Sequence, residues 1–280
     1  MIFKKENTEL MEVKIRIKLN ENLYVKDPEE SKLGQNIVSN SIILINKIGF
    51  DKFTIRKLAV SIDSNEPSIY RYFENKQQLL KYLISWYWSW IEYRISMLIQ
   101  NISDPVEKLR KVINALANSV VYDPIFAHID ETSLAHIVIK NSDINYIAEQ
   151  VQEGEKDYVF HSYNSLCTKI SNIVKEVNPD FPNPKAIAIS MIRMTHEQIF
   201  FTKYYPKITD IKASDTDLTE IINYVERVIF STILLSTNKP GKNKGKVEQI
   251  KKLKSFINLI HVNLAVLVQP LTSFTLWPEL

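Results

Sequence analysis

Long stretches of helical periodicity, separated by breaks that contain proline, dominate this sequence. Apolar side chains recur three or four residues apart, the spacing of one face of an α-helix. Only five of the 280 residues are glycine, too few for a turn-rich β-sandwich, so the sequence predicts an all-α protein. The stretches with this pattern are about residues 27–48, 75–100, 104–121, 143–177, 183–205 and 216–236.

The first 26 residues show a different pattern. Val13, Ile15, Ile17 and Leu19 alternate with polar residues, as in a strand with one wet face. A turn at residues 20–22 then predicts a small β-hairpin that ends near Val25. An isolated hairpin is marginal in water, so we expect this arm either to pack on the body of the protein or to touch DNA.

The formal net charge of +3 hides a strong segregation of charge. Residues 31–81 carry eight basic and four acidic side chains, whereas residues 82–238 carry fourteen basic and nineteen acidic ones. Residues 239–254 carry seven lysines and one glutamate. Two short regions therefore hold the positive charge, and each is a candidate surface for binding anions.

The last 43 residues begin with a lysine-rich run that predicts a flexible basic linker. Residues 247–268 can form one more helix, which ends before Pro270, and a strand is conceivable at 272–277. Polar residues, among them Asn258 and His261, interrupt this apolar tail, so we expect no membrane span. The lysine run could be a solvated linker, could add non-specific affinity for DNA, or could contact anionic lipid.

Residues 49–76 carry the pattern that points to a function. Thr54 can cap a short helix, with Phe53 and Leu58 as a hydrophobic staple around that cap. After a turn at residues 63–65, Asn65 can cap a second helix over 66–73. In that helix Ile69 and Phe73 should point inward, and Ser68, Arg71 and Tyr72 should lie outside. Two short helices braced by the preceding one predict a helix-turn-helix, whose second helix enters the major groove of DNA.

Residues 31–82 closely resemble the DNA-binding domain of TetR-family transcriptional regulators. The resemblance implies phosphate contacts from some side chains and base contacts from others, and it assigns no contact to Glu66. The family usually has Gly and an apolar residue where this chain has Asp63-Ser64, and a small or basic residue in place of Glu66. The operator sequence therefore cannot be transferred from the family. The motifs that carry the resemblance are Gly49-Phe50, Phe53-Thr54-Ile55-Arg56-Lys57-Leu58-Ala59, Ser68-Ile69-Tyr70-Arg71-Tyr72-Phe73, Asn75-Lys76 and Leu79-Leu80.

The implied DNA-binding set has nine members. Thr54, Tyr70, Tyr72 and Lys76 would contact phosphates, and Ser68 and Arg71 would contact bases. The whole set is Thr54, Lys57, Asn65, Glu66, Ser68, Tyr70, Arg71, Tyr72 and Lys76.

The resemblance also implies a homodimer that binds a near-palindromic double-stranded operator, more often as a repressor than as an activator. The last two long helices, 183–205 and 216–236, would pair in the dimer. An aromatic stripe on the helix after Lys76 is either core or one wall of a pocket for a small apolar or aromatic ligand. The candidate ligand-binding residues are Trp86, Trp90, Tyr93, Phe200 and Tyr204.

Other activities lack support in the sequence. Cys167 is the single cysteine, and no phosphate loop, dinucleotide fingerprint or nucleophile elbow is present. His196-Glu197 lacks the second histidine of a zinc protease motif. We therefore expect no enzyme, no metal site and no cofactor. Because the start of the chain has no apolar run, we expect no signal peptide and a cytoplasmic protein.

These inferences divide the chain into four regions. Residues 1–26 form the arm or hairpin, and residues 27–82 form the helix-turn-helix domain. Residues 83–237 form a helical domain for ligand binding and dimerisation, and residues 238–280 form the basic linker and last helix. The alternative is a helical protein-interaction module with a degenerate helix-turn-helix, whose basic tail would bind an acidic partner.

Overall fold

The computed structural model describes residues 16–120, 128–140, 156–214 and 216–235. Within these residues the fold is all-helical, with no strand beyond a single bridge between Ser214 and Asp217. The helices are α1 (Lys32–Ile48), α2 (Ile55–Ser61), α3 (Glu66–Tyr70), α4 (Lys76–Ile99), α5 (Pro105–Ala117), α6 (Glu131–Lys140), α8 (Lys156–Val159), α9 (His161–Val177), α10 (Pro184–Tyr204) and α11 (Thr219–Leu235), and the 3-10 turns are η1 (Glu21–Leu23), η2 (Pro28–Glu30) and η3 (Asn118–Val120).

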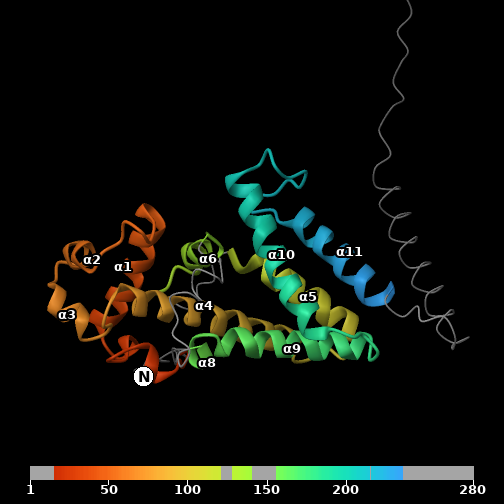
Figure 1. The fold of residues 1–280 in the computed structure, drawn as a ribbon, viewed down its shortest axis with the longest axis horizontal. Helices are drawn as coiled ribbons and strands as arrows, with labels where there is room; N and C mark the ends of the chain where they lie inside the picture. The colour runs from red at the N-terminus through yellow and green to blue at the C-terminus, as the bar shows by residue number, and fades with distance from the viewer. Residues whose placement is uncertain (1–15, 121–127, 141–155, 215, 236–280) are drawn as a thin grey trace, which may run out of the picture. The chain divides into compact units, whose positions relative to one another are not determined.

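The central element is α4, which runs from the group formed by α1, α2 and α3 into the group formed by α5, α9, α10 and α11 (Figure 1). Residues 79–88 of α4 are all buried, and a helix buried on every side must be covered by several neighbours. Those neighbours are α5, α6, α8, α9 and η1. No helix in the described ranges is long and apolar enough to cross a bilayer.

Most of the predicted helices are confirmed within a few residues at each end. The predicted helix over 104–121 ends at Ala117 and continues as η3, and Asp104 caps it by accepting from the backbone N–H groups of Val106 and Glu107 at 3.2 and 3.3 Å. The stretch 143–177 is broken at Phe160, and its residues 143–155 lie outside the described part. Helix α6 was not predicted from the sequence.

The predicted hairpin is wrong for the residues that the structure describes. Residues 16–27, here called the N-terminal strap, contain the turn η1 and no strand. The Asn20 side chain accepts from the backbone N–H of Asn22 at 2.9 Å, which favours a helical turn, and Leu19 and Leu23 are buried against the body. The strap also donates from the Val25 backbone N–H to the Tyr72 carbonyl at 2.8 Å. Residues 13–15 of the predicted strand lie outside the described ranges, as do the predicted C-terminal helix and strand.

The predicted first helix starts later than expected. The predicted start at Asp27 becomes the turn η2, after which Ser31 is extended and caps α1 by accepting from the Gly34 backbone N–H at 3.0 Å. At its other end Gly49 adopts φ +79°, which supplies the predicted stop. Gly34 is packed tightly against η2, since a Cβ atom at this position would lie 2.5 Å from the Cα atom of Pro28.

We expect Gly34→Ala to destabilise the protein by about 1–3 kcal/mol, because the new methyl group would overpack the contact between α1 and η2. This loss should exceed the gain of about 1 kcal/mol that alanine brings to a helix. Urea denaturation measures the change. The control is Lys32→Ala in the same helix. Because the Lys32 side chain is exposed, its removal should change the free energy of unfolding by less than about 0.5 kcal/mol. Unchanged stability of Gly34→Ala would contradict the packing described here.

Candidate nucleic-acid interface

The first short helix is fixed as the sequence predicted. The Thr54 hydroxyl accepts from the Lys57 backbone N–H at 3.2 Å, which caps α2. Phe53 and Leu58, on either side of the cap, are fully buried. This arrangement confirms the predicted cap, and the burial of both side chains is what the predicted hydrophobic staple requires.

The turn between α2 and α3 is also confirmed. Asp63 adopts φ +50°, a left-handed conformation that Asp tolerates better than most residues. The Ser64 backbone N–H donates to the Ala59 carbonyl at 2.9 Å, and the Asn65 side chain accepts from the Ser68 backbone N–H at 3.0 Å. The departure from the usual Gly-containing turn therefore leaves its geometry intact.

The helix α3 presents a small polar face to solvent. Ile69 and the following Phe73 are fully buried and anchor the helix, as predicted. On the outer side Pro67, Tyr70 and Arg71 are exposed, whereas Glu66 and Ser68 are half-buried. The helix itself is shorter than predicted and ends at Tyr70.

The prediction that Tyr72 lies outside is wrong. Its side chain is only 4% exposed, and its hydroxyl group lies 2.8 Å from the Ser31 hydroxyl. The N-terminal strap causes this burial, since the Lys26 ammonium lies 5.6 Å from the centre of the Tyr72 ring and Val25 bonds to the Tyr72 backbone. Tyr70, at 44% exposure, is the accessible tyrosine of this pair.

The basic side chains near α3 differ in how they are engaged. The Lys57 ammonium donates to the Lys52 carbonyl at 2.7 Å. The Lys76 ammonium lies 3.4 Å from the Phe53 carbonyl oxygen and 4.8 Å from the centre of the Phe50 ring. Arg56 is exposed and makes no hydrogen bond or ion pair with another described residue. The sequence-derived set omitted Arg56, although its position beside Lys57 was a usable signal.

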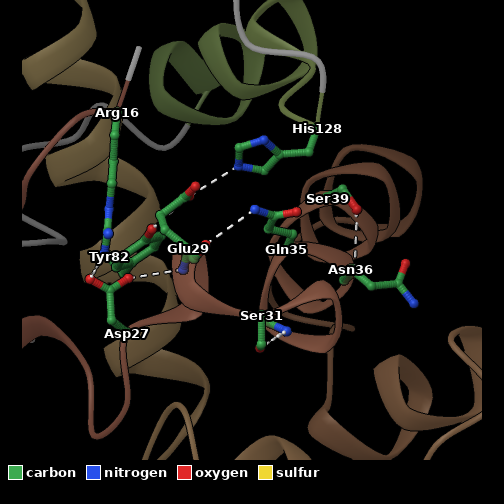
Figure 2. A network of polar contacts seen from close by, with 10 residues as sticks. Arg16, Asp27, Glu29, Ser31, Gln35, Asn36, Ser39, Tyr82 and His128 are labelled. Atoms are coloured by element: carbon green, nitrogen blue, oxygen red, sulfur yellow. Dashed lines mark hydrogen bonds and ion pairs between the residues drawn. The ribbon is translucent and has the colours of Figure 1, made fainter. Parts of the chain in front are cut away.

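A polar network centred on Glu29 joins the N-terminal helices to the rest of the fold (Figure 2). The Glu29 carboxylate lies 3.0 Å from the His128 Nε2 atom and accepts from the Tyr82 hydroxyl on α4 at 3.3 Å. Its backbone carbonyl accepts from the Gln35 side chain at 3.2 Å. Burial, and then the negative charges of Glu29 and Asp27, raise the pKa of Tyr82 well above its usual value. The network therefore ties η2 to both α4 and the segment that leads into α6.

A second polar cluster lies inside the helical body, between α4, η3 and α10. The Tyr87 hydroxyl lies 3.0 Å from the His196 Nε2 atom and donates to the Ser119 hydroxyl at 3.1 Å. The Trp88 ring stacks on the His196 imidazole at a centroid distance of 5.4 Å. Burial, with a smaller contribution from Arg193, lowers the pKa of His196 to about 4. Sequence reasoning noted His196 but could not find this cluster, because its members come from distant segments.

The five candidate ligand-binding residues lie in two groups. Trp86 and Trp90 on α4 are fully buried, with ring centroids 6.3 Å apart. Phe200 and Tyr204 on α10 have ring centroids 5.1 Å apart, and Tyr204 is exposed. Tyr93 is half-buried on α4.

His136 and Cys167 are two further groups with the chemistry to bind a metal or act as a nucleophile. The His136 Nε2 atom lies 2.9 Å from the Lys203 ammonium. Burial raises the pKa of the Cys167 thiol to about 11, so this thiol is protonated at neutral pH. Within the described ranges no three His, Cys, Asp or Glu side chains come close enough to hold a metal ion.

The buried His196 predicts a pH dependence of stability. Its folded-state pKa of about 4 lies below the value of about 6.5 in an unfolded chain. Between these values the unfolded chain binds the extra proton, so stability should fall as the pH falls from 6.5 towards 4, by up to about 1.4 kcal/mol per pH unit. His196→Gln should flatten this slope in urea denaturation, whereas His161→Gln, which removes an exposed imidazole, should not. Equal slopes in wild type and His196→Gln would contradict the prediction.

Comparison with known proteins agrees with this geometry. Residues 37–83 match the family model of bacterial regulatory proteins of the tetR family. No curated protein matches the chain in sequence. The fold is similar to that of a regulatory protein in the TetR family from Rhodococcus RHA1, with 14% identity, a TM-score of 0.55, and coverage of 72% of this chain and 97% of that one.

The fold is also similar to that of AibR, solved in complex with isovaleryl coenzyme A and operator DNA. The identity is 14%, the TM-score is 0.51, and the match covers 69% of this chain and 96% of AibR. At such identities the likeness establishes the fold, while the match over residues 37–83 establishes the domain that carries α2 and α3. The chain therefore carries the N-terminal domain of bacterial regulatory proteins of the tetR family, within a fold similar to that of solved regulators of that family.

Proposed function

We propose that this chain is a repressor that binds a near-palindromic operator as a homodimer and is released by a small ligand. The proposal rests on the structure of α3, which we call the reading helix. It is capped by Asn65, anchored by Ile69 and Phe73, and presents Tyr70 and Arg71 to solvent. In a helix-turn-helix dimer, two such helices enter successive major grooves about one helical turn apart.

Phosphate contacts would come from the side chains that flank the reading helix. Thr54, Lys57, Tyr70 and Arg56 are all exposed around α2 and α3. Each lysine or arginine that meets a phosphate releases bound cations, which makes affinity fall with salt. In our proposal Tyr72 and Lys76 stabilise the fold of the helix-turn-helix and do not contact phosphates. The Tyr72 hydroxyl bonds to the Ser31 hydroxyl, and the Lys76 ammonium bonds to a backbone carbonyl.

The ligand would act at the junction of α4 with α9 and α10. There Tyr87, Trp88, Tyr163 and His196 set hydroxyl and imidazole groups among aromatic rings. A small, partly aromatic ligand that binds this region would favour one position of α4 over another. The Glu29 network then gives such a shift a direct mechanical connection to the N-terminal helices. AibR, with a similar fold, was solved with both a small ligand and DNA, which supports the proposal.

DNA binding by the full chain tests the proposal. In gel shifts with the DNA upstream of its own gene, affinity should rise as salt falls. Arg71→Ala should relax base preference at one position of each half-site, because arginine reads guanine through its O6 and N7 atoms. Arg56→Ala should weaken binding to all DNA sequences alike. It should also reduce the slope of log affinity against log salt concentration by about one.

Three results would each contradict a different part of the proposed function. Equal losses on every sequence for both variants would show that Arg71 does not read a base. No DNA binding at any salt concentration would overturn the proposal and favour the interaction module with a degenerate helix-turn-helix. Retained binding that no added small molecule alters would contradict the ligand-release step.

The homodimer would form through α10 and α11. Ile189, at 39% exposure, and Tyr204 lie on the outer side of α10, and Leu235 is exposed at the end of α11. Exposed apolar side chains on two neighbouring helices are typical of an interface between copies.

We expect Ile189→Glu to convert the dimer to a monomer, because it would bury a charge at the interface. Analytical ultracentrifugation measures the mass in solution. Asn172→Glu, which introduces the same charge at an exposed position on α9, should leave the dimer intact. A dimer that persists in Ile189→Glu would place the interface elsewhere.

A further inference from the structure

The reading helix and the residue that directly follows it carry two charges of opposite sign that do not pair with each other. Within residues 65–71 the charged side chains are Glu66 and Arg71. Arg71 donates to the Ser68 hydroxyl at 3.4 Å. The Glu66 carboxylate makes no hydrogen bond or ion pair with another residue of the described ranges, although Lys52, Arg56 and Lys57 belong to the same helix-turn-helix. It therefore keeps its full capacity to accept hydrogen bonds.

The backbone at Glu66 is held in a fixed place. The Asn65 side chain accepts from the Ser68 backbone N–H, and Pro67 locks the backbone between them. The buried Ile69 sets the rotation of α3 about its axis. Since the first residues of a recognition helix lie nearest the base edges, Glu66, the first residue of α3, would be among the side chains nearest the groove in a complex with DNA.

A carboxylate in that position needs a donor from the DNA. Phosphates repel it, and an unpaired charge that loses its water is costly. In the major groove the base donors are the N4 amino group of cytosine and the N6 amino group of adenine. The adenine amino group is flanked by two acceptors, N7 and the thymine O4 atom, whereas the cytosine amino group has an acceptor, guanine O6, on one side only. A negative acceptor therefore favours cytosine.

We propose that Glu66 selects a cytosine in each operator half-site by accepting a hydrogen bond from its N4 amino group. This inference rests on the proposed function, because it requires that α3 enters the major groove. It turns the acidic residue, which departs from the family pattern, into a determinant of sequence specificity. Arg71, which does not neutralise Glu66, remains available for a guanine.

The test is selection of binding sites from a randomised double-stranded DNA pool with the full-length chain, its Glu66→Gln variant and a Glu74→Gln control. Glu74 is an exposed carboxylate just beyond α3, so the control makes the same change in charge outside the reading helix. The wild type should enrich cytosine at one position of each half-site. Glu66→Gln should change that preference to adenine, because glutamine bonds to adenine N6 and N7, by about tenfold in relative affinity. Glu74→Gln should keep the wild-type preference.

Two results would overturn the inference. If Glu66→Gln strengthens binding to all sequences equally, as expected for simple relief of phosphate repulsion, Glu66 does not read a base. The same holds if wild type and Glu66→Gln enrich identical sites. If the wild type enriches no sequence at all, the proposed function fails together with the inference, and this outcome is separate from the first two.

Discussion

The continuous burial of α4 from Leu79 to Trp88 is the constraint on which the rest of the structure depends. Ten consecutive buried residues leave no face of this part of the helix for water, so other elements must cover every side. Helices α5, α6, α8 and α9 and the turn η1 do so. The same helix begins at Lys76, directly after the reading helix region, so the packing of the body and the position of the DNA-binding surface share one rigid element.

Two groups of polar contacts connect α4 to the helices and turns around it. Near its start, the Tyr82 hydroxyl donates to Glu29, which also contacts His128 before α6. Further along, Tyr87 contacts Ser119 and His196 in the interior. Buried polar groups of this kind are stable only with their partners in place. A change in the packing of α10 or of the segment before α6 would therefore alter the balance of contacts along α4.

The helix-turn-helix was predictable in detail because its determinants are local. The caps at Thr54 and Asn65, the left-handed Asp63 and the buried Ile69 and Phe73 all act within a few residues of their own position. The exception is Tyr72. Tyr72 contacts Val25 and Lys26 of the N-terminal strap, some forty-five residues earlier in the sequence, and local periodicity carries no information about such contacts.

The sequence by itself determined the all-helical class, the approximate extent of most of the long helices and the helix-turn-helix, because periodicity, caps and proline breaks act over short distances. Only the tertiary structure decided that residues 16–27 form a strap with a single 3-10 turn in place of the predicted hairpin, that Lys76 bonds to loop carbonyls, and that Tyr87 meets His196 in the core. It also showed that Glu66 and Arg71 do not pair with each other, since Arg71 donates to Ser68. Each of these depends on which distant segments supply a partner, and that choice follows from packing around α4.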